Sequence, residues 1–358
     1  MRPPPPLRLL LALFYGKNDN GLSTRFYGQF TPAYLGVDDG QETFSEAVDN
    51  NHSNSRVGID IKQAFDRNVL RFNFETALGL RQSNAVSQTT RPDAISFDAR
   101  DVIRFVDVSL KTNTLGTVYA GQGSMATDHV AQLTFSGTAL VAYNAIGETA
   151  GAFRFRATEG VLSDNTIGAA FPSFDGPRLG RVRYDTPSFH GFHGQVAAGY
   201  DILNDDSDRT SFDAALVYAR DFDGLQVKGA VGYANNRFAG GAPRSNGIGS
   251  LTMLFDSGFN FEIAGGTQSG DGDYGYGKVG YLAQWWAVGS TALAIDYYQG
   301  TDTTSSGSRS TSYGFGVVQT FKDVRIEAYV GLRGYELDET AVDYQDMSSI
   351  FAGARWKF

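Results

Sequence analysis

The chain contains no cysteine and no long apolar run, and each absence excludes a class of protein. Without cysteine it has no disulfide framework and no thiolate metal centre, and such a chain can cross an oxidising compartment unfolded without mispairing thiols. A transmembrane helix needs about 20 consecutive apolar residues, and no run of that length occurs. The formal net charge of -9 argues against a nucleic-acid partner, because nucleic-acid-binding proteins present a basic surface.

The feature that recurs along the chain is alternation of apolar and polar residues. It is clearest in residues 56–62, 70–75, 211–218 and 324–333, whereas helical periodicity is scarce. Successive side chains of a β-strand point to opposite faces, so each segment predicts a strand with one apolar and one polar face. The chain ends in the same pattern, because every second residue counted back from Phe358 is apolar.

The alternation predicts sixteen strands, joined by connections that are short and long in turn. The predicted strands are residues 22–35, 53–65, 69–80, 101–111, 116–123, 179–187, 192–201, 210–220, 225–234, 247–256, 259–268, 274–285, 290–299, 310–321, 324–335 and 348–358. An even strand number, with tight turns at one rim and long loops at the other, is typical of outer-membrane proteins. The predicted fold class is therefore all-β: a sixteen-stranded antiparallel transmembrane β-barrel of residues 22–358.

A soluble β-sandwich is the alternative, because its strands also alternate. Strand lengths near the 9–11 residues that cross a bilayer favour the barrel. Aromatic residues also gather at predicted strand ends, as in Trp285–Trp286 and Tyr297–Tyr298, where a barrel carries its interfacial girdles.

The bilayer then decides which face of the sheet points outward. In lipid every backbone polar group must be paired, and only a closed sheet has no edge. The apolar face, including Trp356 and Phe358, must contact hydrocarbon, and a sixteen-stranded barrel is wide enough to hold water inside. The charged residues predicted to face this lumen include Arg56, Asp60, Arg71, Glu75, Lys228, Arg325 and Arg333.

Two segments lie outside the alternation. Residues 124–178 form the longest connection, and their apolar content is too high for a solvated loop. We expect this segment to fold into the lumen as a constriction loop. Residues 1–21 begin MRPPPPLRLLLALF, and two interpretations stay open: a truncated or mis-started export signal, whose apolar core is short, or an irregular proline-rich tail.

Several short segments, in their order and spacing, resemble a known family. They are FYGQF (26–30), SRVGI (55–59), RFVDVSLKTNTLGTVYAGQ (104–122), PSFDG (172–176), GRVRYDTPSFHGF (180–192) and the terminal Phe358. Together they resemble the trimeric general porins of the Gram-negative outer membrane over about residues 22–358.

The resemblance implies a homotrimer in the outer membrane, in contact with lipid and lipopolysaccharide, that lets small hydrophilic solutes diffuse through a water-filled channel. It implies no cofactor and no enzymatic activity. Two alternatives remain: a porin selective for a sugar, an anion or phosphate, and a non-conducting structural or adhesive protein.

In such porins an arginine cluster on the wall faces carboxylates on the third loop. The residues at matching motif positions are Arg56, Arg104 and Arg181, and parity along the strands adds Arg25 and Arg71. The acidic candidates are Glu148, Glu159, Asp164 and Asp175. Parity counted from Arg104 turns Asp107 outward, which a subunit interface would tolerate and lipid would not.

The remaining polar motifs indicate loops more than sites. GDGDYG (270–275) lacks the flanking strand and helix of a phosphate-binding loop. His190 and His193 bracket one short turn, whereas His52 and His129 lie far away in loops. Because zinc usually takes three or four nitrogen or sulfur ligands and the chain has no cysteine, we predict no metal site. Acidic residues between 336 and 346 form a solvated loop or bind divalent cations that bridge lipopolysaccharide.

Overall fold

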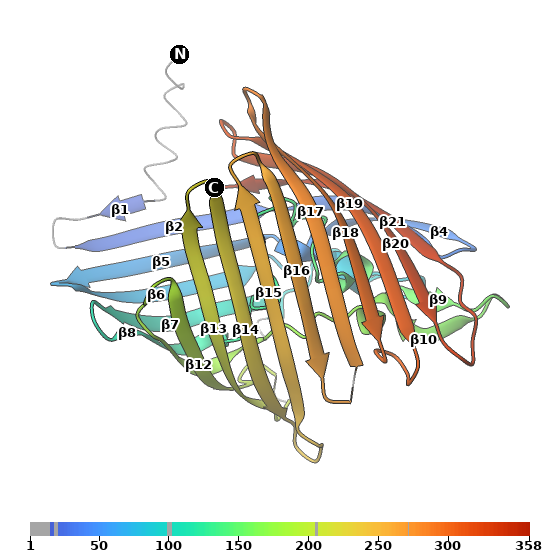
Figure 1. Ribbon diagram of the computed structural model, residues 1–358, viewed down its shortest axis with the longest axis horizontal. Helices are drawn as coiled ribbons and strands as arrows, with labels where there is room; N and C mark the ends of the chain where they lie inside the picture. Colours follow the sequence, from blue (N-terminus) through green and yellow to red (C-terminus); the bar gives the residue numbers. More distant parts are fainter. Residues whose placement is uncertain (1–14, 18–20, 99–101, 205–206, 271) are drawn as a thin grey trace.

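The computed structural model describes residues 15–17, 21–98, 102–204, 207–270 and 272–358. Its strands form one antiparallel sheet that closes on itself as a barrel (Figure 1). The wall consists of β2 (Leu22–Phe30), β3 (Pro32–Asp38), β4 (Thr43–Asp49), β5 (Arg56–Phe65), β6 (Asn68–Ala77), β7 (Ile103–Thr112), β8 (Gly116–Ser124), β11 (Arg178–Asp185), β12 (Phe192–Tyr200), β13 (Thr210–Phe222), β14 (Leu225–Arg237), β15 (Arg244–Phe255), β16 (Phe259–Gln268), β17 (Gly272–Trp286), β18 (Gly289–Thr301), β19 (Arg309–Phe321), β20 (Ile326–Asp338) and β21 (Met347–Lys357).

These elements make sixteen transmembrane strands, because two of the transmembrane strands are each interrupted and so consist of two elements. β2 and β3 continue each other across Thr31, where the ladder is interrupted next to Pro32, which has no N–H to donate. β4 and β5 form the second interrupted transmembrane strand and are separated by the 3-10 turn η1 (Asn51–Ser53). The predicted sixteen-stranded antiparallel barrel is confirmed.

The last residues close the barrel. β21 pairs with β20 on one side and with β2 and β3 on the other. Beyond the strand, the backbone of Phe358 exchanges two hydrogen bonds with Gly28, at N···O distances of 3.0 and 3.2 Å. Gly28 is needed here, because a Cβ would meet the Phe358 ring at 2.5 Å. The terminal phenylalanine therefore seals the seam and leaves no free sheet edge.

One predicted loop is wrong. Residues 36–52 were expected to be a long connection, but most of them form the β3–β4 hairpin. Most inward side chains of this hairpin are apolar, and Leu35 and Val37 are each 1% exposed. Glu46, opposite Leu35, is the exception and pairs with Arg81. This part of the wall therefore has only a small part of the polar inner face that the prediction required.

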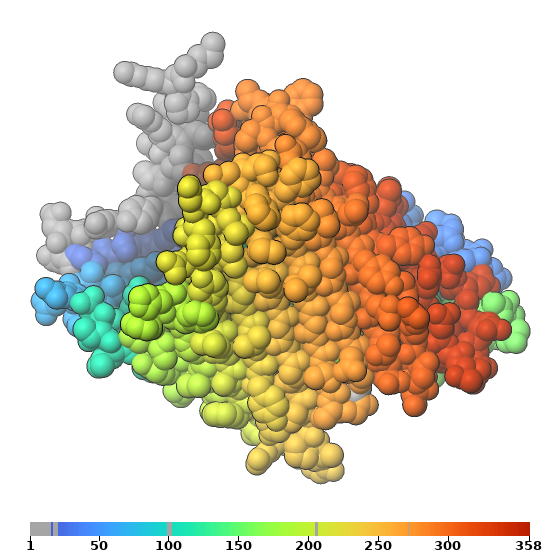
Figure 2. Space-filling model, in the orientation of Figure 1, coloured from blue at the N-terminus to red at the C-terminus, as the bar shows by residue number. Residues whose placement is uncertain are grey.

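On most other strands the two faces of the wall follow the predicted alternation, but Arg325, predicted to face the lumen, lies exposed in the turn before β20. On β13, Phe212 and Leu216 are 59% and 47% exposed, whereas Asp213 between them is fully buried. Figure 2 shows the outer surface where β13 to β21 lie side by side. Apolar side chains are thus on the outside and ionic ones on the inside, as a lipid environment requires.

The other described elements are small. β1 (Tyr15–Lys17) pairs with β2, and β9 (Arg154–Arg156) pairs with β10 (Leu162–Thr166). The short helical turns are η2 (Ser83–Ala85), α3 (Gly147–Ala150) and α4 (Ile167–Ala170). No helix in the described ranges is long and apolar enough to cross a membrane. Residues 1–14 and 18–20 lie outside the described residues.

The long loop, residues 124–178 (cyan to green in Figure 1), packs against inward-facing residues of the wall. Its start is held by Asp213, which accepts hydrogen bonds from Ala126 N (3.1 Å), Thr127 N (2.8 Å) and Thr127 Oγ1 (2.6 Å). Further along, Lys278 Nζ donates to the Ala142 carbonyl at 3.2 Å.

Apolar contacts fix the same loop against β17 to β20. Val141 lies over Gly316 and Gly331, where a Cβ on either glycine would approach it to 2.8 Å. The Phe171 ring packs edge-on against Tyr298 and Tyr335, at centroid distances of 5.4 and 5.8 Å. This side of the barrel interior is a dry core, closed by the loop.

We predict that Asp213→Ala releases the start of the long loop while the barrel stays folded. Three donors lose a buried acceptor, and each such loss costs about 1–3 kcal/mol. Limited proteolysis with mass spectrometry should show faster cleavage between residues 124 and 135. Asp223→Ala, at an exposed turn after β13, is the matched control. Equal cleavage rates in wild type and Asp213→Ala would contradict this anchoring role.

Candidate functional site

Two of the predicted arginines converge on one carboxylate. Arg104 Nε lies 2.6 Å from Glu75 Oε1, and Arg56 Nε lies 3.6 Å from the same atom. The three residues come from β7, β5 and β6. Both guanidinium groups keep about a fifth of their side-chain surface exposed. One acid is therefore set against two fixed cations that remain open to the solvent.

A β-bulge explains how Arg104 reaches this position. Glu75 is opposite Phe105 and Thr76 is opposite Ile103, so Arg104 is an extra residue between the two pairs. The extra residue shifts the parity of the strand. Asp107 therefore points inward and is 6% exposed, which corrects the expectation that it faces outward.

Arg181 takes that inward Asp107 as its partner. Its Nη2 lies 2.6 Å from Asp107 Oδ2, and its Nε and Nη1 donate to the carbonyls of Ser124 and Gly121. Only 2% of its side chain is exposed. The expectation that Arg181 lines the pore is wrong, because its charge is fully used inside the wall.

Arg25 and Arg71 lie nearer the turn between β5 and β6. Arg71 Nε is 2.9 Å from Asp60 Oδ1, and Asp60 also pairs with Lys62 at 3.3 Å. Arg25 lies opposite Asp60 in the ladder and stacks over the Tyr27 ring. These residues form a second charged group, separate from the one around Glu75.

Two further arginines join Arg56 and Arg104, and the sequence interpretation missed both. Arg178 and Arg355 lie close enough to Arg56 to interact with it electrostatically. Arg355 binds Glu327 at 2.7 Å and Ser53 Oγ at 2.8 Å. It stood on the predicted polar face of the last strand, so a signal existed, whereas Arg178 was assigned to the end of the long loop. We call these four arginines the basic cluster.

The four acidic candidates separate into two pairs. Glu159 is exposed, and the Asp164 side chain is fully exposed, with Arg154 as its ion-pair partner at 3.3 Å. Glu148 instead interacts electrostatically with Arg178, and Asp175 does so with Asp128. The structure therefore brings Glu148 and Asp175, but not Glu159 or Asp164, towards the basic cluster.

The acidic residues between 336 and 346 are partly occupied by their own loop. Glu339 accepts hydrogen bonds from Thr304, Ser305 and Tyr344 at 2.7 to 3.1 Å. In the described part of the chain they form no compact group of three ligands. A lipopolysaccharide-bridging cation at this loop stays a prediction.

Comparison with known families agrees with this geometry. A family model described as Gram-negative porin matches residues 18–340, nine-tenths of the chain. The chain belongs to the Gram-negative porin family. This porin is thus an outer-membrane β-barrel of the channel-forming class. A comparison with curated protein sequences found no match.

Solved porin structures share the fold of this porin at low sequence identity. The anion-selective porin from Comamonas acidovorans is 16% identical, with a TM-score of 0.63 over 94% of this chain and 100% of its own. The trimer form of OmpT from Vibrio cholerae is 16% identical, with a TM-score of 0.56 over 94% and 100%. OprB from Pseudomonas putida is 9% identical, with a TM-score of 0.62 over 95% of both chains.

Glu148 connects the porin's long loop to two other loops. Its carboxylate accepts hydrogen bonds from the side-chain amides of Asn51 and Asn84, and its carbonyl accepts one from Ser83 Oγ at 2.7 Å. Burial raises the pKa of Glu148 to about 7, although the charge of Arg178 lowers it somewhat. Near neutral pH the group is therefore close to half ionised.

A pH dependence follows from this raised pKa. The folded state binds the Glu148 proton more tightly than the unfolded chain does, so the stabilisation is complete below about pH 4.5 and is lost as pH rises through 7. Amide exchange of residues 147–151 should become faster between pH 5 and 8, relative to the intrinsic rate. Glu148→Gln should remove that dependence, and Glu159→Gln should not. A wild-type profile that is flat over this range would contradict the assignment.

Proposed function

We propose that this porin is a passive channel for small hydrophilic solutes, narrowed by the long loop and selective for anions. The observation that carries the proposal is the excess of fixed positive charge at the basic cluster. Arg56 and Arg104 share Glu75, and Arg178 lies 3.7 Å from Asp128 without a hydrogen bond, so these three arginines face two carboxylates. Unbalanced cations in a lumen of low dielectric attract anions and repel cations.

A polar cavity beside the cluster supports this role. It has a volume of about 520 Å³, and its charged lining residues are Arg104 and Arg178 with Asp98 and Asp201. The dry core between the long loop and β17 to β20 leaves the water-filled path to this other side of the barrel. Solutes would therefore pass the arginines at short range. The Comamonas relative is itself anion-selective.

The proposal assigns no catalytic role to any residue, since the charged side chains act only on passing ions. It includes a homotrimer in contact with outer-membrane lipid and lipopolysaccharide. The trimer form of the Vibrio cholerae OmpT structure, which shares this fold, supports that assembly.

We predict that Arg56→Ala, Arg104→Ala and Arg178→Ala each shift selectivity towards cations. A unit charge about 4 Å from an ion in water contributes about 1 kcal/mol, so each change should lower the anion permeability and raise the cation permeability by up to about fivefold, and the ratio of the two should fall by up to about 25-fold. Reversal potentials in planar bilayers under a salt gradient measure this ratio. Arg220→Ala, at an exposed site near the β13–β14 turn, is the control.

The same recordings separate the alternatives. Unchanged reversal potentials in all three variants would contradict the proposed role of the cluster. Saturable block by one solute would indicate a substrate-selective porin. A wild-type barrel without conductance would indicate a structural or adhesive protein.

A further inference from the structure

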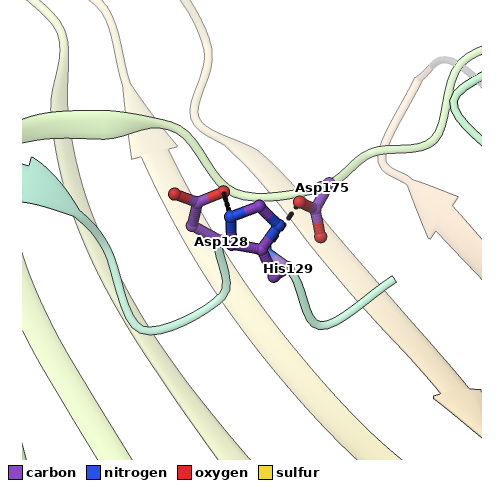
Figure 3. Close-up of side chains that lie close together, drawn as sticks. All are labelled: Asp128, His129 and Asp175. Carbon is purple, nitrogen blue, oxygen red and sulfur yellow. Dashed lines mark hydrogen bonds and ion pairs between the residues drawn. The ribbon is translucent and has the colours of Figure 1, made fainter. Parts of the chain in front are cut away.

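Asp128, His129 and Asp175 meet where the two ends of the long loop come together (Figure 3). Their ligand atoms all lie within 4.8 Å of one another, although 46 residues separate His129 from Asp175. Gly176 makes the approach possible, because a Cβ there would lie 2.5 Å from Asp128 N. Gly176 N also donates to the Thr127 carbonyl at 3.3 Å. The meeting point is thus fixed by the backbone.

The carboxylate of Asp175 is held in one orientation. Its Oδ2 accepts from His129 N at 2.7 Å, and its Oδ1 accepts from Ala131 N at 2.9 Å. Each oxygen keeps a second lone pair for a further ligand. Backbone amides that orient a carboxylate in this way are the support that a metal ligand needs.

Asp128 supplies a buried carboxylate oxygen that lacks a hydrogen-bond donor. Its side chain is 6% exposed, and its Oδ2 has no hydrogen-bond donor. Its ion-pair partner, Arg178 Nε, is 3.7 Å from that oxygen, beyond hydrogen-bond distance. Its Oδ1 lies 3.7 Å from His129 Nε2, so the side chain points into the group.

We propose that Asp128, His129 and Asp175 bind a divalent transition-metal ion of the Zn²⁺ class. One imidazole nitrogen and two carboxylate oxygens are a ligand set that Zn²⁺ accepts, with water in the fourth position. The water would come from the open side, because the His129 side chain is 58% exposed. Calcium and magnesium are less suited, since both prefer oxygen ligands alone.

The charge at the site favours a dication. Burial and the neighbouring Asp128 raise the pKa of Asp175 to about 6, while the amide donors and His129 lower it. Two carboxylates this close repel each other, and a bound ion would relieve that repulsion. The ion would link residues 128–129 to residue 175 and so stabilise the point where the two ends of the long loop meet. Its binding does not depend on the proposed conductance.

Zn²⁺ titration of the folded, metal-stripped protein in detergent tests the site. Calorimetry should show one Zn²⁺ per chain, and His129→Ala and Asp175→Asn should each weaken binding at least about tenfold. His193→Ala, which changes a histidine on β12, is the matched control and should bind as the wild type does. Arg178→Gln removes the competing cation and should tighten binding.

The outcomes are opposed in direction, so a general loss of folding does not imitate them. Absence of stoichiometric Zn²⁺ binding to the wild type would overturn the proposal. So would equal Zn²⁺ affinity in wild type and His129→Ala. Since binding is read without conductance, a failure here leaves the anion-channel proposal intact, and a failure of that proposal leaves this site intact.

Discussion

The structure depends on one requirement: in a bilayer, every backbone N–H and C=O must find a partner within the protein. A sheet meets that requirement only by closing on itself, and here closure is completed by the hydrogen bonds between Phe358 and Gly28. Closure also determines the environment of each strand side chain, since each strand residue points either to lipid or to the interior. The ionic residues that give the channel its charge are inside for this reason.

The interior has an apolar core in one part and a polar cavity in another. Beneath the long loop the inner wall is apolar and aromatic, with Leu35, Phe171 and Tyr298 in one buried cluster. Elsewhere in the barrel, Arg104 and Arg178 line a polar cavity, and the Arg56 side chain is 22% exposed. The loop buries the apolar part of the wall, and under the proposed function it confines solutes to the charged part. Glycines at the contact points, such as Gly316 and Gly331, let it approach the strands.

Much of this architecture could be predicted from alternation alone, because a barrel wall between lipid and water imposes period 2 on the sequence. The prediction failed where that condition does not hold. The inner face of β3 and β4 is mostly apolar, because the long loop covers it. These two strands were therefore predicted to be a connection. The bulge at Arg104 reversed the parity that seemed to send Asp107 outward. Arg181 matched a family motif, but its burial depends on a partner, Asp107, that only the bulge brings within reach. The group of Asp128, His129 and Asp175 is assembled by the path of the loop, which no local pattern encodes.

The central claim is the orientation of the wall, and the absence of cysteine from the chain makes a direct measurement possible. Leu70→Cys, Arg71→Cys and Phe72→Cys place single thiols at three consecutive positions of β6. In sealed outer-membrane vesicles, a charged, water-soluble maleimide should label position 71 quickly and positions 70 and 72 slowly or not at all. Rapid labelling at 70 and 72 with protection at 71 would contradict the account, because the oily face would then be the one in contact with water.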